Sequence, residues 1–186
     1  LINSCLKKIK KKSKILDLGC GSGIVGISLF KKGFVKEPLY FSDVSRTSIK
    51  NVKINATLHN INVIAKASSL FSSWKGYKFD YIINDVAGIS EIIASKSQWY
   101  KKISCKTGKS GTDLVNKIIS QSKKYLNKNG SLIMPTISLS NEKIIMKHMK
   151  KHFNKIDKIS SVDWPLPKNM YTHEKLINDL KKKSFI

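Results

Sequence analysis

Short runs of apolar residues alternate along the chain with longer stretches whose apolar positions recur every three or four residues. This alternation predicts strands between helices, and hence an α/β fold with a doubly wound, mostly parallel sheet and helices on both faces. Strands are expected over residues 14–18, 39–43, 62–65, 79–84, 131–135 and 156–162. Helices are expected over residues 1–13, 23–32, 45–58, 111–127, 141–152 and 172–182.

Local signals support several of these elements. The run Phe-Asp-Tyr-Ile-Ile-Asn at 79–84 is nearly continuous in apolar residues, as is typical of a central parallel strand. Ser45 is a suitable N-cap for the third helix, because its hydroxyl can accept an early amide hydrogen bond. Lys-Asn-Gly at 128–130 predicts a glycine stop for the helix over 111–127. No repeat or linker divides the chain, so one domain is expected over 1–186; it begins at Leu1 rather than Met, which is compatible with a missing N-terminal segment.

The composition is strongly basic, with 35 Lys and Arg, 12 Asp and Glu and a net charge of +23. Arg46 is the only arginine, and such a bias can reflect codon usage alone; the alternative is a polyanionic partner such as RNA or a ribosomal particle. No apolar run approaches the ~20 residues that cross a bilayer. Cys5, Cys20 and Cys105 are too few and too scattered for a disulfide framework or a zinc site, which favours the cytoplasm.

The candidate chemistry is concentrated at residues 14–23, Lys-Ile-Leu-Asp-Leu-Gly-Cys-Gly-Ser-Gly. This order predicts a strand, a tight turn and the start of a helix. Glycines allow positive φ and the close approach of a ligand, and nucleotide-like ligands bind where a parallel strand meets such a turn. The segment therefore predicts a site for an adenosine-containing cofactor.

Two cofactors compete for this segment. Gly21, Gly23 and Gly26 match G-x-G-x-x-G, and Asp43 follows at the distance expected of a ribose-binding acid, which suits an NAD-dependent oxidoreductase. Asp17, Gly19, Gly21 and Gly23 also form D-x-G-x-G-x-G. This form suits S-adenosylmethionine (SAM), whose amino group and sulfonium give an acid at the strand end a cationic partner.

With these motifs the chain resembles the class I SAM-dependent methyltransferases, and in particular the small-domain methyltransferases that include the release-factor glutamine methyltransferases. Residues 15–23 resemble the first motif of that family, 41–45 the second, 68–71 an adenine-binding segment and 79–85 the fourth motif. The resemblance covers residues 14–135. It implies a Rossmann-like, seven-strand-type sheet and SAM as the cofactor.

The resemblance also implies a set of binding residues. The residues implied to bind the cofactor are Asp17, Gly19, Cys20, Gly21, Gly23, Asp43, Val44, Ser69, Leu70 and Asn84. Asp43 would hold the ribose hydroxyls. Ser69 stands where the family often has an acid that meets the adenine amine, so a hydroxyl without charge replaces that acid.

The acceptor side departs further from the family. Nitrogen-methylating members carry Asn-Pro-Pro-Tyr after the fourth strand, and this chain has Asn84-Asp85-Val86-Ala87. Asn84 can hold an N–H of a planar acceptor nitrogen, and Asp85 can accept a proton, or else serve as a helix cap or surface acid.

Trp99 and Tyr100 are candidates to stack on a flat acceptor in place of the missing tyrosine, or else anchor a long loop. His148 and His152 have the i, i+4 spacing of a metal pair but lack an acidic third ligand, so no metal site is expected.

The leading expectation is a cytoplasmic SAM-dependent methyltransferase acting on a nitrogen of a macromolecular acceptor, either a translation-related protein or RNA. Two alternatives stay open. One is a basic RNA- or ribosome-binding module that keeps the fold without catalysis, and the other is the NAD-dependent oxidoreductase. The sequence predicts no oligomeric state.

Overall fold

The computed structural model describes residues 1–86, 88–100, 105–166 and 168–186. They fall into two compact units, of which the first consists of residues 1–86 and 121–135 and the second of the remaining described residues. Whether the two units act together as the single domain expected over residues 1–186 stays a prediction.

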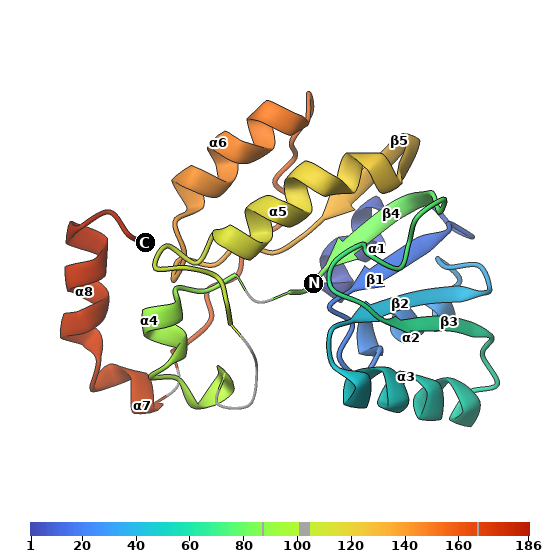
Figure 1. The fold of residues 1–186 in the computed structure, drawn as a ribbon, viewed down its shortest axis with the longest axis horizontal. Coiled ribbons are helices and arrows are strands. Elements are labelled where there is room, and N and C mark those ends of the chain that lie inside the picture. Colours follow the sequence, from blue (N-terminus) through green and yellow to red (C-terminus); the bar gives the residue numbers. More distant parts are fainter. Residues whose placement is uncertain (87, 101–104, 167) are drawn as a thin grey trace. The chain divides into compact units, whose positions relative to one another are not determined.

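The first unit contains a five-stranded, fully parallel sheet in the order β3-β2-β1-β4-β5 (Figure 1). Its strands are β1 (Ile15–Leu18), β2 (Leu39–Asp43), β3 (Val63–Ala67), β4 (Phe79–Asn84) and β5 (Leu126–Ile133). All four residues of β1 are buried, as expected of a central strand covered on both faces. Leu18 pairs with Ser42 on one side and with Asn84 on the other, so β1, β2 and β4 end together at one edge. We call this the carboxyl edge.

The helices of the first unit alternate with its strands. They are α1 (Ile2–Lys8), α2 (Ile24–Lys31), α3 (Arg46–Leu58) and the 3-10 turn η2 (Lys123–Tyr125). Helix α2 contacts β1 and β2, and α3 contacts β2 and β3. Ser45 caps α3 as predicted, because its hydroxyl accepts a hydrogen bond of 3.2 Å from the Ser48 amide.

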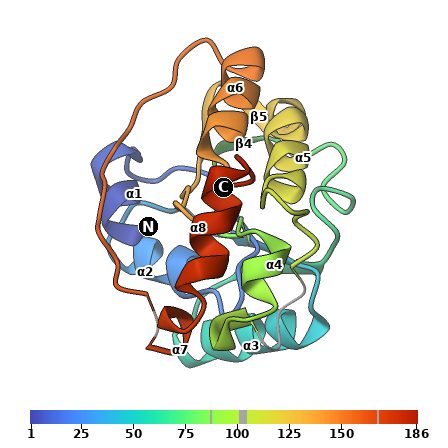
Figure 2. The same ribbon diagram turned by 90° about the vertical axis from the view of Figure 1, so that its left-hand side faces the viewer.

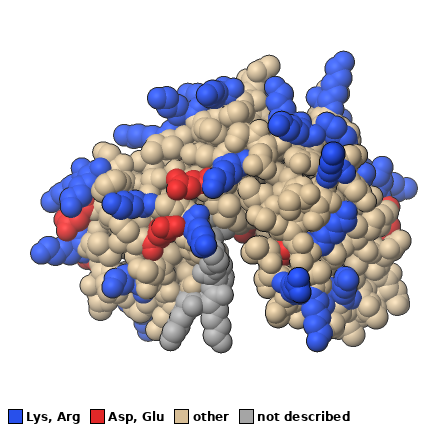
Figure 3. Space-filling model, in the orientation of Figure 1, with Lys and Arg blue, Asp and Glu red and all other residues tan. Residues whose placement is uncertain are grey.

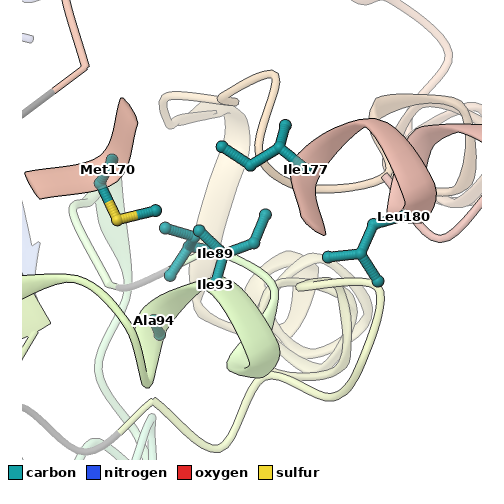
Figure 4. Close-up of a cluster of buried hydrophobic side chains, with 6 residues drawn as sticks. All are labelled: Ile89, Ile93, Ala94, Met170, Ile177 and Leu180. Carbon is teal, nitrogen blue, oxygen red and sulfur yellow. The ribbon is translucent and has the colours of Figure 1, made fainter. Parts of the chain in front are cut away.

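The second unit is built mainly of helices. They are α4 (Glu91–Ala94), η1 (Gln98–Tyr100), most of α5 (Asp113–Ser122), α6 (Glu142–His152), α7 (Lys168–Tyr171) and α8 (Glu174–Lys182). Helices α4 and α8 lie side by side, as do α5 and α6 (Figures 1 and 2). A buried apolar cluster joins the first pair and α7 (Figure 4), and its residues are Ile89, Ile93, Ala94, Met170, Ile177 and Leu180.

The sequence predictions are confirmed for the fold class and for the central elements. Strands β2 and β4 have the predicted bounds, and β1, β3, α2, α3, α6 and α8 lie within two residues of theirs. The strand count differs from the seven-strand type, because the described residues form five strands in the sheet. Among the described helices, none combines the length and apolarity needed to span a membrane.

The glycine stop was wrong, and with it the helix over 111–127. Helix α5 ends at Ser122, and residues 126–133 already form β5, so this strand starts before the predicted Ser131 and ends before Pro135. Gly130 serves close packing rather than a helix end. A Cβ there would lie 2.9 Å from the Phe79 carbonyl oxygen, beside a register shift between β4 and β5.

Two further elements were wrong. Helix α1 ends at Lys8 rather than at residue 13, because Ile9 is extended and the Ser13 hydroxyl bonds the Lys10 carbonyl in a turn. Residues 156–162 form no strand in the described structure, and most of these residues are exposed. A mixed run of isoleucine, lysine and serine supplies β propensity without an apolar face to bury.

Candidate functional site

The loop after β1 has the conformation that its glycines predict. Gly19, Gly21 and Gly23 have φ angles of 74°, 53° and 81°, in the left-handed region. The amides of Gly19 and Cys20 both donate to the Ser42 carbonyl oxygen, at 2.7 and 3.1 Å. The loop is therefore fixed to the end of β2.

Two of these glycines differ in what surrounds them. A Cβ on Gly19 would lie 2.6 Å from Val86 Cγ2 and 3.1 Å from the Val86 amide nitrogen, so protein fills that side. A Cβ on Gly21 would meet no atom within 4 Å. Gly21 thus leaves open space over the loop, where the backbone is accessible to a ligand.

Asp17 is the buried acid beneath this loop, with 1% of its surface exposed. Its Oδ2 accepts a 2.9 Å hydrogen bond from the Gly26 amide in the first turn of α2. Its Oδ1 is buried and has no hydrogen-bond partner among the described residues. Burial raises the pKa of Asp17 to about 7, opposed by the Gly26 bond and reinforced by the charges of Asp85 and Asp43. When Asp17 is ionised, this buried oxygen can be satisfied by a donor or a cation from outside the described residues.

Asp43, at the end of β2, supports the same loop. Its Oδ2 accepts from the Gly21 amide at 2.9 Å, and its Oδ1 accepts from the Ser45 amide at 2.8 Å. The carboxylate is half-buried, and each of its oxygens accepts one of these two hydrogen bonds. The neighbouring Val44 is 72% exposed, an unusual position for a large apolar side chain.

The loop after β3 is organised by Ser68, which precedes the predicted cofactor residues Ser69 and Leu70. The buried Ser68 hydroxyl contacts the Ser72 hydroxyl at 3.1 Å and accepts from the Ser73 amide at 3.2 Å. Leu70 has a left-handed φ of 51°, and its carbonyl oxygen accepts from the Ser42 and Ser68 hydroxyls. Ser69 is exposed on this loop.

β4 brings Asn84 to the same edge. Asn84 is 1% exposed, and its Oδ1 accepts a 3.2 Å hydrogen bond from the Val86 amide. The Asp85 amide donates to the Leu18 carbonyl oxygen at 3.1 Å, which holds the next residue beside β1. The Asp85 side chain is exposed, yet the protein around it excludes enough water to raise its pKa.

The carboxyl edge is thus acidic in a basic chain. The charges of Asp85 and Asp43 both raise the pKa of Asp17. Burial, and after it the charges of Asp17 and Asp43, raise the pKa of Cys20. The predicted cofactor residues of β1, β2, β3 and β4 and their following loops all lie in the first unit, next to this edge. The sequence missed Ser42 and Ser68 because a serine at a strand end has no distinctive signal without the neighbouring backbone.

The two aromatic residues predicted to stack on the methyl acceptor, Trp99 and Tyr100, belong to the second unit. The Trp99 side chain lies outside the described residues. The Tyr100 ring is half-buried and borders a hollow of about 330 Å³ that is also lined by Glu91, Ala94, Ser95, Cys105 and Lys106. The His148 and His152 rings lie 4.7 Å apart, and no group of three metal-ligating side chains is found among the described residues.

Comparison with known proteins agrees with this geometry. Residues 1–85 match the family "Methyltransferase small domain". A protein of Methanocaldococcus jannaschii named as a protein N5-glutamine methyltransferase is 29% identical over 140 residues, which cover 75% of this chain and 70% of that protein. The release factor glutamine methyltransferase of Borreliella burgdorferi is 27% identical and aligns over 81% of this chain but 54% of its own length. The chain therefore spans about half of that relative.

Among solved structures, the fold matches the 16S rRNA N2 G1207 methyltransferase of T. thermophilus, determined with AdoMet and guanosine. The TM-score is 0.63 at 10% identity, over 87% of this chain and 39% of that one. The fold, the glycine loop and the matched family agree on one assignment. The chain has the fold of the class I SAM-dependent methyltransferases, and it is similar to the small-domain methyltransferases that include the release factor glutamine methyltransferases.

Proposed function

We propose that the carboxyl edge of the first unit binds SAM and that the protein methylates a nitrogen atom of a translation-related macromolecule, either a protein or RNA. The observation that carries this proposal is the buried Asp17 carboxylate, whose Oδ1 is unpartnered among the described residues beneath an open glycine loop. SAM is a cationic ligand with a sulfonium and an ammonium group. A buried carboxylate gains most from such a partner, because removing it from water has weakened its own solvation.

The residues present fit this cofactor. The loop residues Gly19, Cys20, Gly21 and Gly23 form a backbone cradle, and the missing Cβ of Gly21 leaves room for the ligand above it. Asp17 Oδ1 would accept from the ammonium group. Asp43, already oriented by the Gly21 and Ser45 amides, would accept hydrogen bonds from the ribose hydroxyls with its free lone pairs.

The adenine would lie between two further loops. Val44 is exposed after β2 and offers an apolar surface for a flat base. Ser69 and Leu70 follow β3, where the Ser69 hydroxyl and local backbone would meet the edge of the base. The Ser68 hydrogen bonds hold this loop in place, so we assign Ser68 a positioning role.

Asn84 and Asp85 are proposed to meet the acceptor. SAM, when bound, supplies an electrophilic methyl carbon that is already activated. A planar nitrogen reacts well only if its lone pair is turned toward that carbon, so the protein must hold its N–H. Asn84 Oδ1 accepts one bond from Val86 and keeps a second lone pair for this N–H. Asp85, with its raised pKa, would take the released proton. Trp99 and Tyr100 remain candidates to stack on the acceptor.

The similarity to glutamine methyltransferases favours a macromolecular acceptor connected with translation. Binding of a polyanion through lysines, and a cytoplasmic location, belong to the same proposal. The second candidate, a basic binding module without catalysis, is favoured by Val86 and Ala87 in place of the family's proline and tyrosine.

Methyl labelling tests the proposal and separates the two candidates. Purified protein and tritiated SAM are added to a lysate of cells that lack the protein, and label is counted in protein, RNA and small molecules. We expect label in protein or RNA that depends on the added chain. Binding of SAM without any methyl transfer would support the second candidate, the binding module without catalysis. Label in small molecules alone would contradict a macromolecular acceptor.

A further inference from the structure

Lysines are distributed unevenly over the first unit. The loops that leave the carboxyl ends of its strands, residues 19–23, 44–45, 68–73, 85–86 and 134–135, contain no lysine. The segments that enter the amino ends of the strands carry many. We call these residues the basic edge: Lys10, Lys11, Lys12, Lys14, Lys32, Lys36, Lys75, Lys78, Lys123 and Lys124.

Backbone and side-chain contacts bring members of the basic edge together. An isolated bridge pairs Ser13 with Val35, and the Lys12 and Lys36 amides donate to the carbonyl oxygens of Gly33 and Ser13. Lys78 Nζ donates to the Lys124 carbonyl oxygen at 2.8 Å, which joins the entrances to β4 and β5. The basic edge therefore runs along the entrances to β2, β1, β4 and β5.

The acids at this end do not neutralise the edge. Asp80 Oδ2 accepts from the Lys14 amide at 2.8 Å, and its Oδ1 accepts from Asn127 at 2.7 Å. Burial opposes ionisation of Asp80, but these bonds and the charges of Lys36 and Lys14 lower its pKa overall. Glu37 accepts from the Asn62 amide. Both acids are thus engaged with the protein itself, whereas all lysines of the edge except Lys14 are exposed.

Lys14 differs because aromatic rings hold it. Its Nζ lies 4.9 Å from the centre of the Tyr40 ring and 5.4 Å from that of Phe79. Cation–π contacts of this kind fix the ammonium group without removing its charge. Lys14 therefore gives the edge a cation held in place by aromatic rings.

From this arrangement we infer that the basic edge is a binding face for the phosphate backbone of RNA, separate from the carboxyl edge. Four neighbouring strand entrances at a spacing of ~4.8 Å spread the charges over about 15 Å, which suits a row of phosphates. The cations are all lysines, which hold phosphates as point charges without reading bases, so this edge would bind the backbone and not a particular sequence.

A compositional bias alone does not account for this pattern. It would place lysines equally at both ends of the strands, whereas the described carboxyl-edge loops have none. Basic side chains outnumber acidic ones on the face drawn in Figure 3, so the decisive feature is the set of loops that lack lysine. RNA bound at the basic edge would lie about one strand length, ~15 Å, from the glycine loop.

The test compares two triple variants that lose the same charge. Lys11→Gln, Lys12→Gln and Lys36→Gln neutralise the basic edge, and Arg46→Gln, Lys50→Gln and Lys53→Gln neutralise exposed positions on α3. Binding of a labelled RNA hairpin is measured by fluorescence anisotropy over a range of salt concentrations. Unchanged thermal midpoints verify that both variants fold, and this control does not depend on the cofactor proposal.

We expect the basic-edge variant to lose at least tenfold in affinity and to reduce the slope of log K against log salt by about 2 to 3, since each phosphate contact contributes ~0.9. The α3 variant should keep the wild-type slope within about 1. Equal losses in both variants, or no RNA binding by the wild type, would overturn the inference. Displacement of the hairpin by polyglutamate at equal charge concentration would also overturn it, in favour of an acidic protein partner.

Discussion

At the scale of single residues, the account depends on Asp17. Its Oδ2 holds the first turn of α2 through Gly26, and its Oδ1 is buried and unpartnered among the described residues. The D-x-G-x-G-x-G pattern predicts this acid, but not that burial raises its pKa to about 7. That value follows from tertiary burial and from Asp85 and Asp43, which come from other strands. The sequence therefore predicts which residue is the acid, but it does not predict the raised pKa of that residue.

The raised pKa of Asp17 predicts a pH-dependent stability. Without ligand, the folded protein retains a proton that the unfolded chain releases above its ordinary pKa of 3.8. The free energy of unfolding should therefore fall as pH rises from about 4 to about 7, and this loss should be absent in Asp17→Asn. Urea unfolding at several pH values measures the difference between the two proteins.

The matched control for this experiment is Asp80→Asn, at the other end of the sheet. Hydrogen bonds and lysine charges lower the pKa of Asp80, so the difference in free energy of unfolding between Asp80→Asn and the wild type should stay constant from about pH 5 to about pH 7. A wild type and an Asp17→Asn variant with parallel pH profiles would show that Asp17 is not buried as described.

Asn84 should affect turnover more than cofactor binding. Asn84→Ala removes the oxygen proposed to hold the acceptor N–H, so we expect about a 100-fold lower rate of methyl labelling. The affinity for S-adenosylhomocysteine should change by less than about threefold, as a transition-state role predicts. Asn127→Ala, which removes the donor to Asp80 at the opposite edge, should keep the wild-type rate. Unchanged turnover in Asn84→Ala would remove this residue from the mechanism.

At the scale of elements, strands and their following turns were predictable where chemistry and local propensity agree. β2 and β4 are apolar runs with polar ends, and Ser45 is a capping residue directly before a helix. The start of β5 was not predictable, because Leu126–Ile133 reads as a helix end followed by a turn. Only pairing with β4 and the tight fit of Gly130 against its carbonyl groups make this segment a strand.

Two alanine substitutions in the glycine loop should differ in their main effect: Gly19→Ala should lower stability, and Gly21→Ala should weaken ligand binding. Gly19→Ala places a Cβ 2.6 Å from Val86 Cγ2 at a left-handed φ, so the free energy of unfolding should fall by about 2 to 4 kcal/mol. Gly21→Ala meets no protein atom and should cost about 1 kcal/mol from φ alone. Its cost should appear instead as at least tenfold weaker binding of S-adenosylhomocysteine. Urea unfolding and calorimetry measure both quantities, and a Gly21→Ala protein with wild-type affinity would contradict the proposed cradle.

The cap of α3 gives a prediction of stability alone. Ser45→Ala removes the acceptor of the Ser48 amide and should lower the free energy of unfolding by about 1 kcal/mol. Thr47→Ala, an exposed position in the same turn, should stay within about 0.5 kcal/mol of wild type. Equal effects of the two substitutions in thermal unfolding would show that the cap contributes nothing specific.

At the scale of the whole molecule, the net charge of +23 conceals two opposite local environments. Asp17, Asp43 and Asp85 gather at the carboxyl edge, which suits a cationic cofactor, whereas ten lysines of the first unit lie at the basic edge. Composition could predict attraction to polyanions in general, but the separation depends on which ends of the strands are neighbours. That information comes from the sheet order and not from the charge count.

The most direct test of the central claim is a calorimetric titration of the purified protein at about pH 8, where Asp17 is ionised. S-adenosylhomocysteine and NADH are titrated separately into the wild type, Asp17→Asn and Asp80→Asn. The account predicts that the wild type and Asp80→Asn bind S-adenosylhomocysteine, that Asp17→Asn binds it at least tenfold more weakly, and that NADH gives no heat of binding. Tight binding of NADH, or equal affinity of all three proteins for S-adenosylhomocysteine, would contradict it.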